Sequence, residues 1–98
     1  MILKRAGSGP GKVLVTFQLP KGLVADTVHV VGDFNNWNRR LHRLTRSEDD
    51  VWQVTLELEH GKTYQFRYLI NGATWQNDWH ADRYVPNPFG GENSVIET

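Results

Sequence analysis

Residues 51–72 of the chain read VWQVTLELEHGKTYQFRYLING, and this stretch decides the fold class. Apolar and polar residues alternate over residues 51–59, and the alternation returns over residues 64–70. A period of two places successive side chains on opposite faces of a β-strand. His60-Gly61 and Asn71-Gly72 follow the two runs as turns, and Asn-Gly is a strong hairpin signal because both residues tolerate positive φ. The stretch therefore predicts two amphipathic strands that are paired with one another.

The rest of the chain repeats this pattern in shorter pieces. Further strands are predicted over residues 12–19, 28–32, 41–46, 73–76 and 94–97. No ten-residue stretch carries a helical stripe, and Gly and Pro interrupt the chain throughout. About seven short strands with turns every ~8–12 residues are typical of an antiparallel sandwich. We therefore predict an all-β, immunoglobulin-like sandwich over residues 12–98, a single domain, preceded by a flexible arm over the Gly-rich residues 1–11.

Composition excludes several classes of function. The 98 residues include 11 Lys plus Arg and 11 Asp plus Glu, so the formal charge is zero. Such a chain has no basic field to hold nucleic acid phosphates or an anionic membrane, and we expect neither partner. The chain has no cysteine, which excludes disulfides, thiolate catalysis and Cys-ligated metals. We expect a soluble domain in the cytoplasm, with no cofactor.

Three side chains attract attention because of where the pattern places them. Arg67 falls on the face opposite the inward row of its strand, where it is either a solvated charge or a free hydrogen-bond donor. Trp37 and Trp75 lie in or beside turns rich in Asn and Gln. Both rings could cap the ends of the sandwich, or they could be stacking platforms for an amphipathic ligand. A pyranose ring fits the second alternative, since it has an apolar face of C–H groups and an equator of hydroxyls.

Three motifs in this order resemble carbohydrate-binding module family 48. They are VVGDFNNWN over residues 30–38, YQFRYLING over residues 64–72 and ENSVI over residues 92–96. The family includes the early-set domains of isoamylase-like and glycogen-branching enzymes, and the glycogen-binding domain of the AMP-activated protein kinase β subunit. The resemblance implies a non-catalytic sandwich that binds α-1,4-glucans such as glycogen or starch.

The resemblance also implies which residues contact the sugar. Trp37 and Trp75 correspond to the stacking pair, and Asn93 corresponds to an asparagine that bonds the glucan. Arg67 stands where the kinase-type domain has a lysine, so the charge is kept but the reach changes. Phe89 stands where the family has an apolar residue at the sugar surface.

Two other functions compete with sugar binding. Catalysis would need paired carboxylates across a cleft, and a sandwich of this size has little room for one. The four histidines show no metal-ligand spacing. The remaining alternative is a protein-docking or spacer module for a glucan-active enzyme, whose surface would be aliphatic and would include Val31, Leu69 and Val85.

Overall fold

The computed structural model describes residues 1–98 and contains nine strands and one 3-10 turn. The elements in chain order are β1 (Ile2–Ala6), β2 (Lys12–Gln18), β3 (Val28–Gly32), η1 (Asp33–Asn35), β4 (Thr45–Arg46), β5 (Trp52–Glu59), β6 (Thr63–Ile70), β7 (Thr74–Gln76), β8 (Arg83–Pro86) and β9 (Glu92–Glu97). The all-β prediction is confirmed, with nine strands in place of about seven. The only helical element, η1, has three residues, and no helix is long enough to cross a membrane.

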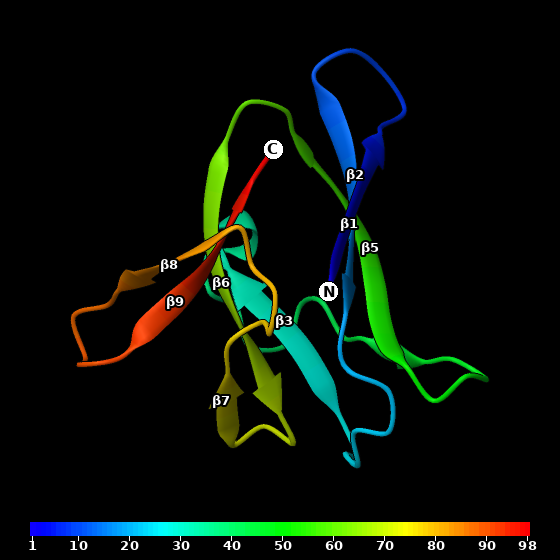
Figure 1. Cartoon of the computed structure of the whole chain (residues 1–98), viewed down its shortest axis with the longest axis vertical. Coiled ribbons are helices and arrows are strands. Elements are labelled where there is room, and N and C mark those ends of the chain that lie inside the picture. The colour runs from blue at the N-terminus through cyan, green and yellow to red at the C-terminus, as the bar shows by residue number, and fades with distance from the viewer.

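The strands form two antiparallel sheets that face one another (Figure 1). One sheet has the order β1-β2-β5-β4, and the other has the order β3-β6-β9-β8, with β7 paired to β6. Strand β6 is central in the second sheet, because β3 flanks it on one side while β9 and β7 share its other side. This placement puts the residues of β6 beside segments that are far apart in the sequence.

The core lies between the two sheets and follows the period of two that the sequence shows. Phe17 of β2 meets Phe66 of β6 edge to face, with ring centroids 5.1 Å apart. Tyr68 continues the inward row of β6 and is fully buried. The cluster contains 11 buried residues: Val15, Phe17, Leu19, Val28, Val30, Leu44, Trp52, Leu58, Phe66, Tyr68 and Ile96.

The first residues of the chain differ from the prediction. Residues 1–11 were expected to form a flexible arm, but Ile2–Ala6 form β1, which pairs with β2 along its length. The Gly-rich residues 7–11 make the turn of this hairpin. The side chains of β1 are almost all exposed, so the strand carries no apolar alternation. Backbone pairing with β2 holds it, together with Ile2 against the core and Lys4, whose Nζ donates to Asp82 and to the carbonyl of Glu97. The sequence analysis also did not predict β8, which is an edge strand with mostly exposed side chains.

Gly32 closes β3 where that strand passes β6 most tightly. A Cβ atom at this position would lie 2.4 Å from the carbonyl oxygen of Gln65 and 2.7 Å from Cβ of Phe66. No side chain fits there without moving one strand away from the other. Close packing therefore requires a glycine here. The backbone conformation does not, because a φ of −172° is ordinary extended backbone.

We expect Gly32→Ala to lower the free energy of unfolding by about 1–3 kcal/mol, because the added methyl overpacks the β3–β6 contact. Urea denaturation followed by far-UV circular dichroism measures this. Gly9→Ala is the matched control, since nothing lies within 4 Å of a Cβ at Gly9. Equal midpoints for the two variants would contradict the close approach.

Candidate functional site

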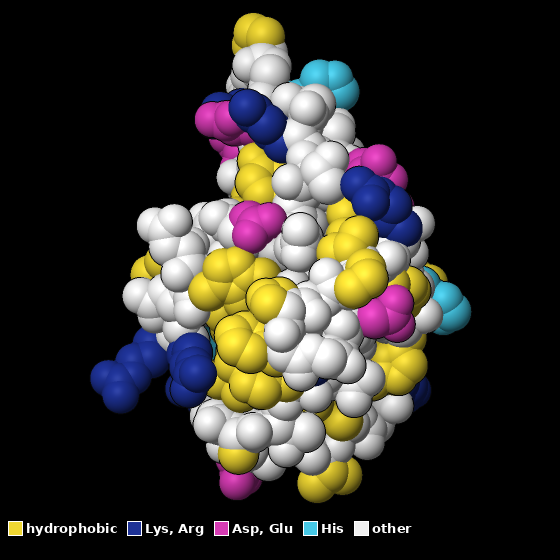
Figure 2. Space-filling view, turned by 90° about the vertical axis from the view of Figure 1, so that its left-hand side faces the viewer, with side chains coloured by type: hydrophobic (Ala, Val, Ile, Leu, Met, Phe, Trp, Pro, Cys, Tyr) yellow, Lys and Arg dark blue, Asp and Glu magenta, His cyan; other side chains and the backbone are white.

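A groove of about 600 Å³ lies on the outer side of the five-stranded sheet. All five residues that the sequence singled out line it: Trp37, Arg67, Trp75, Phe89 and Asn93. They come from the loop after η1, from β6, β7 and β9, and from the β8–β9 loop. Figure 2 views the side of the molecule on which β7, β8 and β9 lie, where hydrophobic side chains gather with Lys and Arg side chains beside them.

The backbone that carries Trp37 has an uncommon conformation. Asn36 and Trp37 both have positive φ, 54° and 56°, directly after η1. Such a φ is rare for a bulky residue and costs about 1–3 kcal/mol. The amide of Trp37 donates to the carbonyl of Gly32 at 2.9 Å, and the amide of Asn38 donates to the carbonyl of Asn35 at 3.1 Å. These bonds hold the turn closed and aim the indole into the groove.

The buried side chain of Asn35 organises this turn. Its Oδ1 accepts a hydrogen bond from the amide of Gly32 at 3.1 Å, and its Nδ2 donates to the carbonyl of Val30 at 3.0 Å. The same Nδ2 lies 2.9 Å from Nδ1 of His42. Because an amide nitrogen can only donate, Nδ1 of His42 accepts this bond, and His42 is neutral with its proton on Nε2. Burial lowers the pKa of His42 below its ordinary value, which favours this neutral state.

Asp33 fixes the indole of Trp37 to the sheet. Its Oδ1 accepts from Nε1 of Trp37 at 3.0 Å, and its Oδ2 accepts from the amide of Gln65 in β6 at 2.7 Å. One carboxylate thus ties the loop aromatic ring to the central strand. The ring is oriented before any ligand arrives, which reduces the ordering entropy lost on binding.

The guanidinium groups of two arginines lie over the ring of Trp75. The register pairs Leu69 with Trp75, so both side chains lie on the outer face of the sheet. The guanidinium carbons of Arg39 and Arg67 lie 5.5 and 5.8 Å from the Trp75 ring centroid, within cation–π range. Neither arginine forms an ion pair, and Nε of Arg67 is buried without a hydrogen-bond partner. Arg67 is thus partly buried at the groove wall, and not a freely solvated charge.

Amide side chains also line the groove. Nδ2 of Asn93 donates to Oε1 of Gln65 at 3.1 Å, and Nδ2 of Asn87 donates to Oδ1 of Asn93 at 3.3 Å. Oδ1 of Asn87 also accepts from the amides of Phe89 and Gly91, which shapes the loop between β8 and β9. Phe89 projects from this loop and is 95% exposed.

Five lining residues were not among the predicted site residues: Asp33, Arg39, Gln65, Asn87 and Pro88. Asp33 lies within the GDFNNW motif and Gln65 faces outward beside Arg67, so the period of two could have found Gln65. The sequence does not indicate that Arg39 lines the groove, because Arg39 lies in a loop whose path depends on the left-handed conformations of Asn36 and Trp37. No group of three His, Asp or Glu side chains lies where it could hold a metal ion.

The arrangement combines flat apolar surfaces with planar polar groups in an open groove. Two indoles and a phenyl ring can each cover an apolar ligand face, while guanidinium and amide groups offer donors and acceptors around it. Residues 23–89 match the family model of carbohydrate-binding module 48, the isoamylase N-terminal domain. The chain belongs to this family. Its members are described as binding modules for carbohydrate, which agrees with the chemistry of the groove.

The carbohydrate-binding module is similar to parts of two curated enzymes. It is 40% identical over 43 residues to the 1,4-alpha-glucan branching enzyme GlgB of Synechocystis sp., a match that covers 43% of this chain and 6% of the enzyme. It is 24% identical over 58 residues to the chloroplastic/amyloplastic 1,4-alpha-glucan-branching enzyme of Oryza sativa subsp. japonica, which covers 52% of this chain and 7% of the enzyme. The match therefore spans a small fraction of each relative's length.

The aliphatic surface expected of a protein-docking module is not present where it was predicted. Val31 is 0% exposed and Leu69 is 3% exposed, although both lie outside the core between the sheets. Val85 is half-buried. Strand β7 pairs with β6 in the same sheet, and its register places Trp75 beside Leu69.

We expect the free energy of unfolding to decrease as the pH falls from about 6.5 to 5. Burial lowers the folded-state pKa of His42 and, with the nearby charge of Arg43, that of His29 below 6.5. The unfolded chain then takes up protons that the folded chain resists, so acid favours unfolding. Urea denaturation at several pH values measures the slope. Glu57 and Asp82, whose pKa values are lowered, respond only below about pH 4.5.

His42→Gln is the matched variant for this measurement, because a glutamine carbonyl can accept the bond from Asn35 without titrating. We expect a weaker pH dependence in His42→Gln than in the parent protein. Identical slopes would show that His42 does not keep its neutral state in the fold.

Proposed function

We propose that this module binds α-1,4-glucans, namely glycogen, starch or maltooligosaccharides, without transforming them. The observation that carries the proposal is the convergence of Trp37 and Trp75 on one groove, together with Arg67, Asn93 and Phe89. Family membership supports carbohydrate as the ligand class, and the names of the similar enzymes support an α-glucan.

The groove suggests how a sugar chain would be held. The apolar C–H faces of two glucose rings would lie on the indoles of Trp37 and Trp75, while Arg67 and Asn93 would bond the hydroxyls at the ring edges. Water competes for those hydroxyls in an open groove, so we expect Kd values from micromolar to millimolar, on the order of −8 to −4 kcal/mol. Longer chains should bind more tightly than maltose, because only they reach both rings.

The setting in which the module works is part of the same proposal. Because the similar enzymes act on 1,4-alpha-glucans, we propose that the module brings a glucan-active enzyme to its polymer, by covalent linkage or by association. We propose the cytoplasm as the compartment in which it works.

We expect Trp37→Ala and Trp75→Ala each to raise the Kd for maltoheptaose or β-cyclodextrin at least tenfold, because each removes one stacking surface. Isothermal titration calorimetry and retention on a glycogen column measure this, and circular dichroism shows whether the fold persists. A flat titration of the parent protein, with no glycogen retention, would refute sugar binding and favour the docking or spacer function.

We expect Arg67→Gln to raise the same Kd about 10- to 100-fold, because a charged hydrogen bond contributes about 1.5–3 kcal/mol. Arg40→Gln is the control, since Arg40 is exposed on the loop after Trp37 but does not line the groove. Equal affinities of the two variants would remove Arg67 from the sugar contacts.

A further inference from the structure

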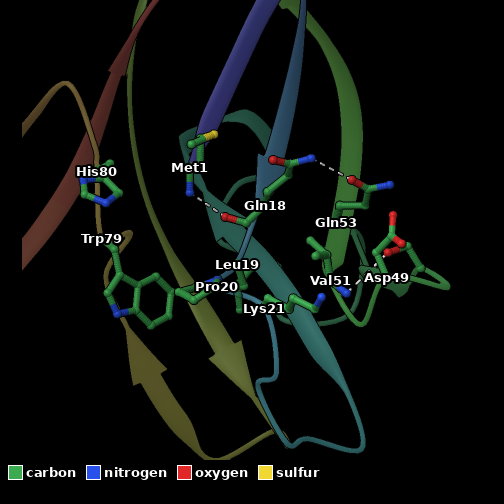
Figure 3. A pocket seen from close by; sticks show the side chains of 11 residues that line it. Met1, Gln18, Leu19, Pro20, Lys21, Asp49, Val51, Gln53, Trp79 and His80 are labelled. Carbon is green, nitrogen blue, oxygen red and sulfur yellow. Dashed lines mark hydrogen bonds between the residues drawn. The ribbon is translucent and has the colours of Figure 1, made fainter.

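A second groove, of about 440 Å³, opens elsewhere on the molecule and shares no lining residue with the Trp37 groove. Its volume lies within the range of small-molecule sites. One wall is Trp79 and His80, from the loop between β7 and β8, and the other includes Gln18 at the end of β2 and Gln53 in β5 (Figure 3). The groove thus spans the two sheets at one end of the sandwich.

Trp79 is a fixed aromatic surface on this groove. The indole is 39% exposed, although one of its faces stacks on Tyr68 with an interplanar angle of 27°. The hydroxyl of Tyr68 donates to Oδ2 of Asp78 at 2.6 Å, and Oδ1 of Asp78 accepts from the amide of His80 at 2.7 Å. The same buried carboxylate therefore holds both the ring beneath Trp79 and the loop that carries it.

The facing wall offers hydrogen-bonding groups in a fixed arrangement. Nε2 of Gln18 donates to Oε1 of Gln53 at 2.9 Å. This bond leaves the Oε1 acceptor of Gln18 and the Nε2 donor of Gln53 without a protein partner. Lys21 and Asp49 also line the groove, and neither forms an ion pair. Lys21 and Asp49 give the groove one charge of each sign, while the N-terminal ammonium of Met1, which also lines it, donates to the carbonyl of Gln18 at 2.6 Å and lies 3.6 Å from the carboxylate of Asp78. These charges balance, so the groove has no preference for an ionic ligand.

We propose that this groove is a second saccharide site, which takes a glucosyl unit on the exposed part of Trp79 with its hydroxyls toward Gln18 and Gln53. The chemistry is that of the Trp37 groove, an aromatic surface faced by planar polar groups, with a charge balance that suits a neutral sugar. The choice of an α-glucan as ligand rests on the proposed function. Two separate grooves allow one polysaccharide to engage the module twice, which raises its apparent affinity through effective concentration.

The four tryptophans make the proposal directly testable. Each indole N–H gives its own signal in a 15N-HSQC spectrum: Trp37 and Trp75 report on the first groove, and Trp79 on the second. Trp52 is the internal control, since it is buried and its Nε1 donates to the carbonyl of Leu23. During titration with maltoheptaose we expect the Trp79 signal to shift and saturate in the millimolar range while Trp52 stays in place.

The titration is repeated in the Trp37→Ala/Trp75→Ala double variant, where the shift of Trp79 should persist with an unchanged midpoint. Gln53→Ala should raise that midpoint severalfold in the same background. If Trp79 stays still while Trp37 and Trp75 shift, or if its shift disappears in the double variant, the second site is refuted and the proposed function stands. If Trp79 alone shifts, the second site stands and the Trp37 groove is refuted as the sugar site. If no indole shifts, both proposals fail.

Discussion

The buried amide of Asn35 makes three hydrogen bonds, and the larger groove depends on them. Through these bonds one side chain joins the end of β3, the 3-10 turn and His42. The chain can then turn sharply at the point where Gly32 lies against β6. A buried polar group of this kind stabilises one conformation, because any other arrangement leaves an amide unsatisfied away from water.

The strained backbone after this turn carries Trp37, one of the aromatic side chains that line the groove. Two successive non-glycine residues adopt left-handed backbone at Asn36 and Trp37, and such conformations persist where surrounding contacts over-determine them. Here the Gly32 carbonyl accepts a hydrogen bond from the amide of Trp37, and the carboxylate of Asp33 accepts bonds from the indole and from the β6 backbone. These contacts hold the strained conformation in place. The aromatic surface is therefore rigid although it lies in a loop. Rigid placement matters most for a weakly held ligand, since little binding energy is available to order the site.

Strands with a local apolar pattern could be predicted from the sequence. Features that depend on how distant segments pack together could not. Alternation located β2, β5 and β6 and their inward rows, because a half-buried strand records burial in every second residue. Strands β1 and β8 have no such alternation, since their side chains are mostly exposed. The predicted site residues do meet in one groove, but Arg39 and Asn87 could not be found, because their positions follow from loop conformations. Val31 and Leu69 are buried although they lie outside the core between the sheets, which the alternation of β3 and β6 cannot show.

The edges of the two sheets bear on how many copies can work side by side. Strand β1, at the rim of the first sheet, carries Lys4 and Arg5, and β4 at its other rim has only two residues. Strand β8, at the rim of the second sheet, carries Arg83 and ends in Pro86. Charge, proline and short length all discourage strand pairing between molecules. These three rims therefore disfavour edge-to-edge aggregation wherever copies of the module are crowded together.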